Sequence, residues 1–236
     1  MKIITLIPSY RPNIARLNRV INDIPTISDV FIFSPDPIVK TVANWVQCPV
    51  ELRDALAFEP RKWIDSHWND DFDYVFYNED DIVVSSAQLL SVISMQESMP
   101  DGNVIGFVRY EMFNGERRYI DLHPAHSVHT GGNGQTDVLI KVDKNWFRPW
   151  NLHSGNFLLS KKQIQRLKND NRWDTHFGQH GVHYCGHLES AATSVYRSFQ
   201  KIIPVNYSLV SVEHLSTKYG YMPDTPNDEI LNKLLA

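Results

Sequence analysis

Three consecutive acidic residues, Glu79, Asp80 and Asp81, stand between two apolar runs in the stretch 74–85, YVFYNEDDIVVS. The run that precedes them is typical of a buried strand. Carboxylates between two buried segments are costly unless another group compensates their charge, and a divalent cation such as Mg²⁺ or Mn²⁺ is suited to that task. A solvated turn between two strands also explains the triplet, so both interpretations stand at this point.

The chain before the triplet alternates between strand and helix patterns. Residues 2–10, KIITLIPSY, form a nearly continuous apolar run, which is typical of a strand buried in a parallel sheet. Apolar residues at helical spacing follow over 13–22, and a second apolar run covers 29–33. A strand, a helix and a strand in this order begin a doubly wound α/β unit. We expect a third strand at 50–53 and a helix over 60–68.

The chain after the triplet continues in the same way. Periodic apolar residues predict a helix over 87–99, a strand-to-helix step over 153–168 and a helix that begins at Glu189. Apolar runs predict further strands at 103–110, 118–122, 138–142 and 202–212. The sequence therefore predicts an α/β fold.

Composition limits the classes of function. The chain has 236 residues and a formal net charge of -4, which argues against a general nucleic-acid binder. Two cysteines make no disulfide framework and suit a reduced compartment. The first residues do not have the pattern of a signal peptide, and no apolar run approaches the length of a membrane span. We expect a soluble, cytoplasmic protein.

Polar residues gather where the first strands end. Pro8, Tyr10 and Arg11 follow the first strand, Asp36 follows the second, and Arg61 precedes the acidic strand. Ligands of open α/β sheets bind beyond the carboxyl ends of strands, where a ring and a guanidinium can hold a base or a phosphate. Surface turn chemistry explains each residue singly, and their convergence on one edge favours a nucleotide. Neither G-x-G-x-x-G nor G-x-x-x-x-G-K-[ST] is present.

The segment IPSY at the end of the first strand and the later strand that ends in Glu-Asp-Asp together resemble the nucleotide-sugar glycosyltransferases of GT-A fold. The resemblance implies a single domain over 1–236, with a mixed central sheet flanked by helices. Its Rossmann-like half, 1–100, would bind the nucleotide, and 101–236 would bind sugar and acceptor. Asp81 matches the acid that chelates Mn²⁺ or Mg²⁺ in the DxD motif of this family. Glu79 stands at the first position, where Asp is commoner, and Asp80 stands between them.

The same resemblance assigns residues beyond the triplet. His153, Ser154, Gly155 and Asn156 match the segment below the donor sugar, although a plain tight turn also explains the glycine. Glu189 matches the acid that serves inverting members as general base, and its alternative is a carboxylate favoured by the helix dipole. His214 matches a third metal ligand, and Lys218 would neutralise the leaving diphosphate; an exposed histidine is the alternative for His214.

Two polar segments allow more than one interpretation. The stretch 123–136, HPAHSVHTGGNGQT, is either a functional lid or a surface loop. The stretch 176–187 holds four histidines and Cys185, and the spacing of His176 and His180 suits zinc on a helix. Glycines in this span disfavour a helix, so we interpret it as a polar acceptor loop.

Together with these observations, the resemblance implies a metal-dependent glycosyltransferase. It would move a sugar from a nucleoside-diphosphate sugar, with UDP as the expected nucleotide, to a hydroxyl of a glycan or similar acceptor. A nucleotidyltransferase acting on sugar phosphates is the first alternative, but it would normally carry a Gly-rich phosphate loop after the first strand. A non-catalytic nucleotide-sugar-binding module is the second, and it would leave the buried acids unexplained.

Overall fold

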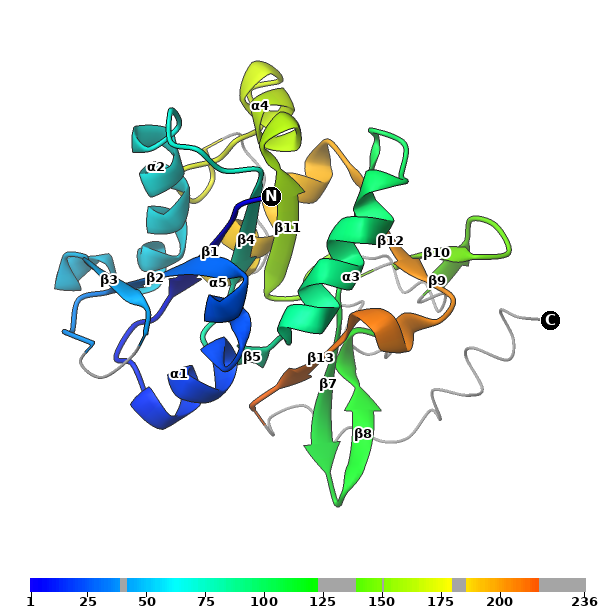
Figure 1. Cartoon of the computed structure of the whole chain (residues 1–236), viewed down its shortest axis with the longest axis horizontal. Coiled ribbons are helices and arrows are strands. Elements are labelled where there is room, and N and C mark those ends of the chain that lie inside the picture. The colour runs from blue at the N-terminus through cyan, green and yellow to red at the C-terminus, as the bar shows by residue number, and fades with distance from the viewer. Residues whose placement is uncertain (39–41, 123–138, 150, 180–185, 217–236) are drawn as a thin grey trace.

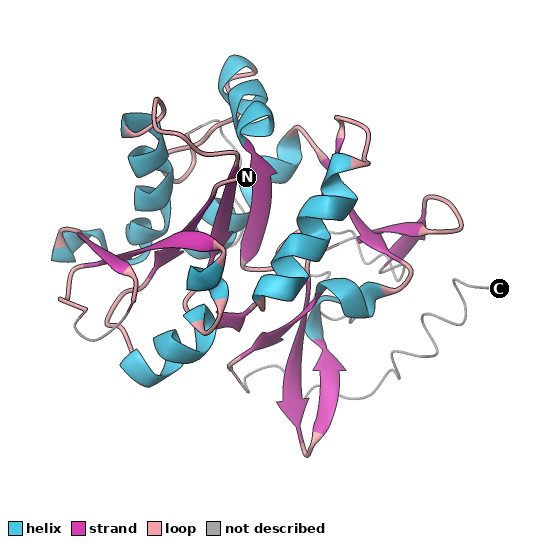
Figure 2. Ribbon diagram, viewed as in Figure 1, coloured by secondary structure: helices cyan, strands magenta, loops and turns pink. Residues whose placement is uncertain are grey.

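The computed structural model describes residues 1–38, 42–122, 139–149, 151–179 and 186–216. Lys218 and the loop 123–136 lie outside these ranges, as does most of the histidine-rich stretch, 180–185. Within the described ranges the chain is α/β, with three mixed sheets and five α-helices, as the alternating pattern predicts (Figures 1 and 2).

The largest sheet is built mainly from the first half of the chain. Its strand order is β11-β4-β1-β2-β3, in which β1 to β4 run parallel and β11 runs antiparallel to β4. Every residue of β1 is buried, which explains its continuous apolar sequence. The bounds are β1 (Ile3–Pro8), β2 (Ser28–Ser34), β3 (Asn44–Gln47), β4 (Tyr74–Asn78) and β11 (Asn156–Ser160).

Helices cover both faces of this sheet. Apolar residues of α1 and α3 pack in one core cluster with β1 and β2, and those of α2, α4 and α5 pack on the opposite face. Capping boxes at Ser85 and Ser160 begin α3 and α4. Both clusters draw residues from before and after position 100. The bounds are α1 (Ile14–Ile21), α2 (Glu59–Ser66), α3 (Ser86–Glu97), α4 (Lys161–Asn169) and α5 (His187–Thr193).

Two four-stranded sheets complete the described part. One has the order β6-β12-β10-β9, and the other has the order β5-β13-β7-β8 and begins directly after the acidic triplet. The hairpin of β7 and β8 projects from the body (Figure 1). The bounds are β5 (Ile82–Val83), β6 (Asn103–Ile105), β7 (Val108–Phe113), β8 (Glu116–Tyr119), β9 (Leu139–Lys141), β10 (Trp146–Pro149), β12 (Gln200–Pro204) and β13 (Ser211–His214).

Three strand predictions were wrong, and two of them concern the same region of the fold. The run 103–110 divides into β6 and β7, and the run 202–212 divides into β12 and β13. β6 pairs with β12 in one sheet, and β7 pairs with β13 in another. The two segments therefore pass from one sheet to the other side by side. Both sides of each break are buried, and apolar periodicity therefore does not reveal it. The predicted strand at 50–53 lies in a 3₁₀ segment, Val50–Phe58.

None of the helices in the described ranges is long and apolar enough to cross a membrane.

Candidate functional site

The acidic triplet lies at the carboxyl end of β4, beside the first residues of β11. The antiparallel register pairs Asn78 with Asn156, and the backbone N–H of Glu79 donates to the carbonyl of Gly155 at 2.9 Å. The side-chain amide of Asn78 donates to the carbonyls of Glu79 and Ile82 at 3.0 and 2.8 Å. These bonds hold the turn that carries the three carboxylates, and they bring the predicted sugar segment next to it.

Glycine is required at position 155. Its φ is +66°, and a Cβ there would lie 2.7 Å from Oε2 of Glu79 and 2.3 Å from Cδ1 of Ile82. The positive φ favours glycine, as in a tight turn, and the absence of a Cβ leaves room for the Glu79 side chain.

The three carboxylates of the triplet contact different parts of the protein. Asp80 accepts from the Ser9 hydroxyl at 2.5 Å and from the Arg16 guanidinium at 2.9 Å, which ties it to the loop and helix that follow β1. Asp81 lies on the other side, with its Oδ2 3.3 Å from Nε2 of His214. Glu79 points toward Gly155.

His214 joins Asp81 to a second carboxylate. Its Nδ1 is 2.8 Å from Oε1 of Glu111, which is fully buried on the neighbouring strand β7. Nδ1 therefore donates to Glu111 and directs Nε2 toward Asp81. Burial alone would lower the pKa of His214, but the hydrogen bond and charge of Asp81 outweigh it and raise the pKa. Burial likewise opposes ionisation of Asp81, and His214 reverses this and lowers its pKa.

Glu79 has the opposite electrostatic character. Burial, followed by the charge of Asp81, raises the pKa of Glu79 to about 8, so this carboxyl holds a proton at neutral pH. The charge of Glu189 adds to the same shift, so the Glu189 carboxylate lies close enough to interact with Glu79. The site thus brings Asp81, whose pKa is lowered, together with Glu79 and His214, whose pKa values are raised.

Two carboxylate oxygens of the triplet have no hydrogen-bond partner among the described residues. They are Oε1 of Glu79 and Oδ1 of Asp81, and both are shielded from solvent. Orphaned oxygens of this kind fit a hard cation, and an imidazole oriented by a carboxylate is a usual neighbour of a metal. However, no group of three or more His, Cys, Asp and Glu side chains within the described ranges is spaced to hold an ion. A cation bound at this position would therefore need further coordinating oxygens from a bound small molecule.

An open pocket of about 130 Å³ adjoins Asp80. It combines the carboxyl end of β1, the 3₁₀ segment after β3 and the first turn of α5. Its lining residues are Pro8, Tyr10, Arg16, Arg53, Asp54, Leu56, Ala57, Asp80 and Leu188. Two guanidinium groups and an aromatic ring in one pocket suit a nucleotide.

Sequence reasoning missed Arg16, Arg53 and Asp54 in this pocket. Arg16 occupies an ordinary polar position of α1, and only its bond to Asp80 distinguishes it. Arg53 has φ 45° and ψ -121°, a strained backbone for a residue other than glycine. Nothing in the local sequence indicates this conformation.

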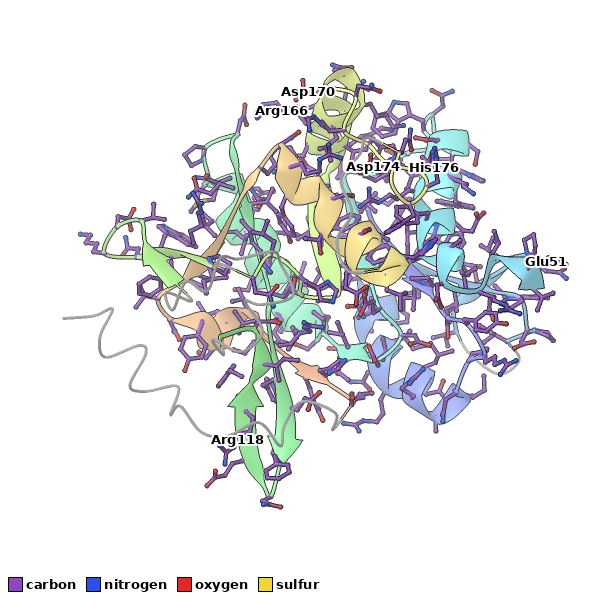
Figure 3. All side chains as sticks on the ribbon, turned by 180° about the vertical axis from the view of Figure 1, so that it is seen from behind. Glu51, Arg118, Arg166, Asp170, Asp174 and His176 are labelled. Atoms are coloured by element: carbon purple, nitrogen blue, oxygen red, sulfur yellow. The ribbon has the colours of Figure 1, made fainter. Side chains whose placement is uncertain are left out.

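Arg61, predicted to contact the nucleotide, is instead buried away from the pocket. Its guanidinium donates to the carbonyl of Asp174 and the hydroxyl of Ser194, both at 3.0 Å, and also to the carbonyl of Ala191. Asp174, labelled in Figure 3, precedes α5 in the chain. The rings of Phe58, Phe157 and Trp173 surround the guanidinium. We correct the prediction: Arg61 fastens α5 to the body of the protein.

Arg61→Met is therefore expected to lower the free energy of unfolding by about 3 kcal/mol, because it leaves buried carbonyls unpaired. Urea unfolding measures this, and nucleotide affinity of the folded variant should not change. Lys62→Met, next in sequence and half-exposed, is the matched control and should stay within about 0.5 kcal/mol of the wild type. Normal stability with weakened nucleotide binding would restore the original prediction.

The remaining predicted residues are not among those that line the pocket. Arg11 has its guanidinium over the ring of Tyr10, 5.5 Å from the centroid, and does not line the pocket. Asp36 is exposed in the loop after β2 and also does not line it. Ser154 and Asn156 are fully buried beside the triplet, and Nδ1 of His153 is 3.3 Å from the hydroxyl of Thr193.

Glu189 lies in the first turn of α5, directly after the pocket residue Leu188. It is half-buried, and a Cβ at Gly186 would lie 2.6 Å from its Oε2. The helix that the sequence predicts from this residue begins at His187. Pocket, triplet and Glu189 thus adjoin one another at one edge of the main sheet.

A comparison of the chain with models of protein families finds no match, and no curated protein matches it either.

Proposed function

We propose that this protein is a glycosyltransferase that uses a nucleoside-diphosphate sugar, has a GT-A-type fold and depends on Mn²⁺ or Mg²⁺. The observation that carries the proposal is the environment of the triplet. Asp81, paired with His214, and Glu79, packed on Gly155, each keep an oxygen without a hydrogen-bond partner among the described residues. Asp80, which stands between them, lines a pocket that also includes Arg16 and Arg53. This arrangement suits a ligand that brings both a cation and phosphate oxygens.

The pocket would receive the nucleoside. Tyr10 offers a ring for the base, and the guanidinium groups of Arg16 and Arg53 attract the phosphates. Asp80, fixed by Ser9 and Arg16, presents an acceptor to a ribose hydroxyl. We keep UDP as the proposed nucleotide because of the resemblance, which the pocket does not contradict.

Asp81 and His214 would hold the cation, with Glu111 orienting the imidazole from behind. A bound Mn²⁺ or Mg²⁺ would offset the charge that develops on the leaving diphosphate. Glu79 holds a proton until a positive charge enters the site, because burial raises its pKa to about 8. It would then bind a sugar hydroxyl or lose its proton to become a ligand.

Glu189 would act as the general base of an inverting reaction. The carboxylate takes the proton of the acceptor hydroxyl, whose oxygen forms a bond to the anomeric carbon. The bond between that carbon and the phosphate oxygen breaks, and the nucleoside diphosphate leaves with the electron pair. The segment 153–156 would support the donor sugar from below.

A panel of nucleotide sugars tests this proposal. We expect a UDP-sugar to raise the melting temperature of the protein when Mn²⁺ is present, and to have little effect with EDTA, because the cation joins carboxylates to phosphates. UDP-glucose, UDP-galactose, UDP-N-acetylglucosamine, GDP-mannose and CMP-sialic acid cover the main classes. A shift with none of these, or an equal shift with and without Mn²⁺, would contradict the proposal.

A further inference from the structure

A buried lysine lies beneath the segment that leads to the acidic triplet. Lys201 belongs to β12 and is 1% exposed, and its Nζ donates to the carbonyl of Leu152 at 2.9 Å. The ammonium also lies 5.4 Å from the centroid of the Tyr196 ring. An ammonium in the interior is costly, so its position calls for a role that a hydrophobic residue would not fill.

The chain makes room for this side chain at one glycine. A Cβ at Gly106 would lie 2.1 Å from Cε of Lys201 and 2.6 Å from its Cγ. Gly106 stands where β6 ends and the chain changes sheet. The missing side chain at this break lets the lysine stem cross the interior to reach Leu152.

The segment 151–155 connects Lys201 to the proposed site. The carbonyl of Leu152 accepts the hydrogen bond from the Lys201 ammonium, and the ring of His153 contacts Thr193 of α5. Three residues beyond Leu152, the carbonyl of Gly155 accepts from the backbone N–H of Glu79. A displacement of Leu152 would therefore be transmitted to both the triplet and the helix that carries Glu189.

We infer that Lys201 is a positioning residue, whose ammonium anchors the segment 151–155 against the acidic triplet and α5. The anchoring itself is independent of the reaction. Its effect on sugar binding rests on the proposed function, in which this segment supports the donor sugar.

The strength of the anchor should depend on pH. Burial lowers the pKa of Lys201 to about 7; the nearby Asp121 carboxylate opposes this shift, and the Arg109 guanidinium adds to it. These two groups pair with each other, and Tyr196 is the further titratable group close to Lys201. Below the pKa of Lys201 the bond to Leu152 is charge-assisted, and above it a neutral amine donates more weakly.

Amide hydrogen exchange of the full-length protein tests the anchor directly. After correction for intrinsic exchange, we expect protection of residues 152–155 to fall about fivefold between about pH 6 and about pH 8.5 in the wild type. Lys201→Met keeps a stem of similar volume and removes the ammonium, so its protection should be low at both pH values. The amides of β1 are the internal reference. Lys162→Met, at an exposed lysine paired with Asp101, is the control.

The affinity for UDP-glucose with Mn²⁺ provides the second readout. In the wild type this affinity should fall as the pH rises, and it should fall more than in Lys201→Met. At about pH 6 the variant should bind more weakly than the wild type. A flat exchange profile in the wild type, which needs no variant, would overturn the inference. So would a variant that keeps the wild-type profile and only melts earlier. If the wild type does not bind UDP-glucose at any pH, the proposed donor fails, while the exchange result still decides whether Lys201 anchors the segment.

Discussion

Asp81→Asn is expected to weaken Mn²⁺-dependent binding of UDP-glucose by at least about 100-fold while the protein remains folded. The amide preserves the shape of the side chain and can accept from His214, but it lacks the charge that would hold a cation between the protein and the donor phosphates. The loss of one carboxylate ligand also leaves His214 next to a neutral group. Because Asp81 raises the pKa of that histidine, the pKa should fall toward its ordinary value.

Isothermal titration with Mn²⁺ and UDP-glucose measures the affinity, and an NMR titration of the His214 ring measures the pKa. Asp101→Asn is the matched control, since Asp101 is exposed and its carboxylate accepts from Lys162, whereas Arg166 donates only to its backbone carbonyl. It should bind the donor as the wild type does. An Asp81→Asn variant with unchanged metal dependence would remove Asp81 from the cation site, whatever its effect on His214.

Glu189→Gln is expected to reduce turnover by a factor of about 10²–10⁴ with little change in donor affinity, because the amide fills the same space but does not accept a proton. The charge of the Glu189 carboxylate also raises the pKa of Glu79, so the substitution should lower the pKa of Glu79. The relevant measurements are the turnover number, the donor dissociation constant and the melting temperature of the same variant.

The same three measurements separate the other roles open to Glu189. If it only stabilises the first turn of α5, the variant should lose about 0.5–1 kcal/mol of stability and keep its turnover. Glu59→Gln is the matched control for that effect, because Glu59 is the acid in the first turn of α2. In a retaining enzyme the carboxylate would hold the donor sugar, and donor affinity would fall together with turnover.

The features that follow from local patterns and from the ends of parallel strands were predictable. The alternation of apolar runs predicted the α/β class, and the run before Glu79 predicted β4. The rule that ligands bind at the carboxyl ends of strands brought Pro8, Tyr10 and Asp80 to one edge, where the structure has the pocket. These predictions depend on the period of the local pattern and on parallel strands ending at the same edge, which the sequence contains.

Contacts between distant residues were determined only by the tertiary structure. The bond of His214 to Glu111 depends on β13 lying beside β7, and no pattern within either strand indicates that pairing. Arg61 carries the same charge on the surface or in the core, and only the carbonyls of Asp174 and Ala191 decide that it is buried. Lys201 stands directly before the apolar run 202–212, and only the folded structure brings it next to Gly106 and Leu152. The sequence determines which side chains can carry charge, whereas the packing of separate strands determines which charges are compensated and which remain for a ligand.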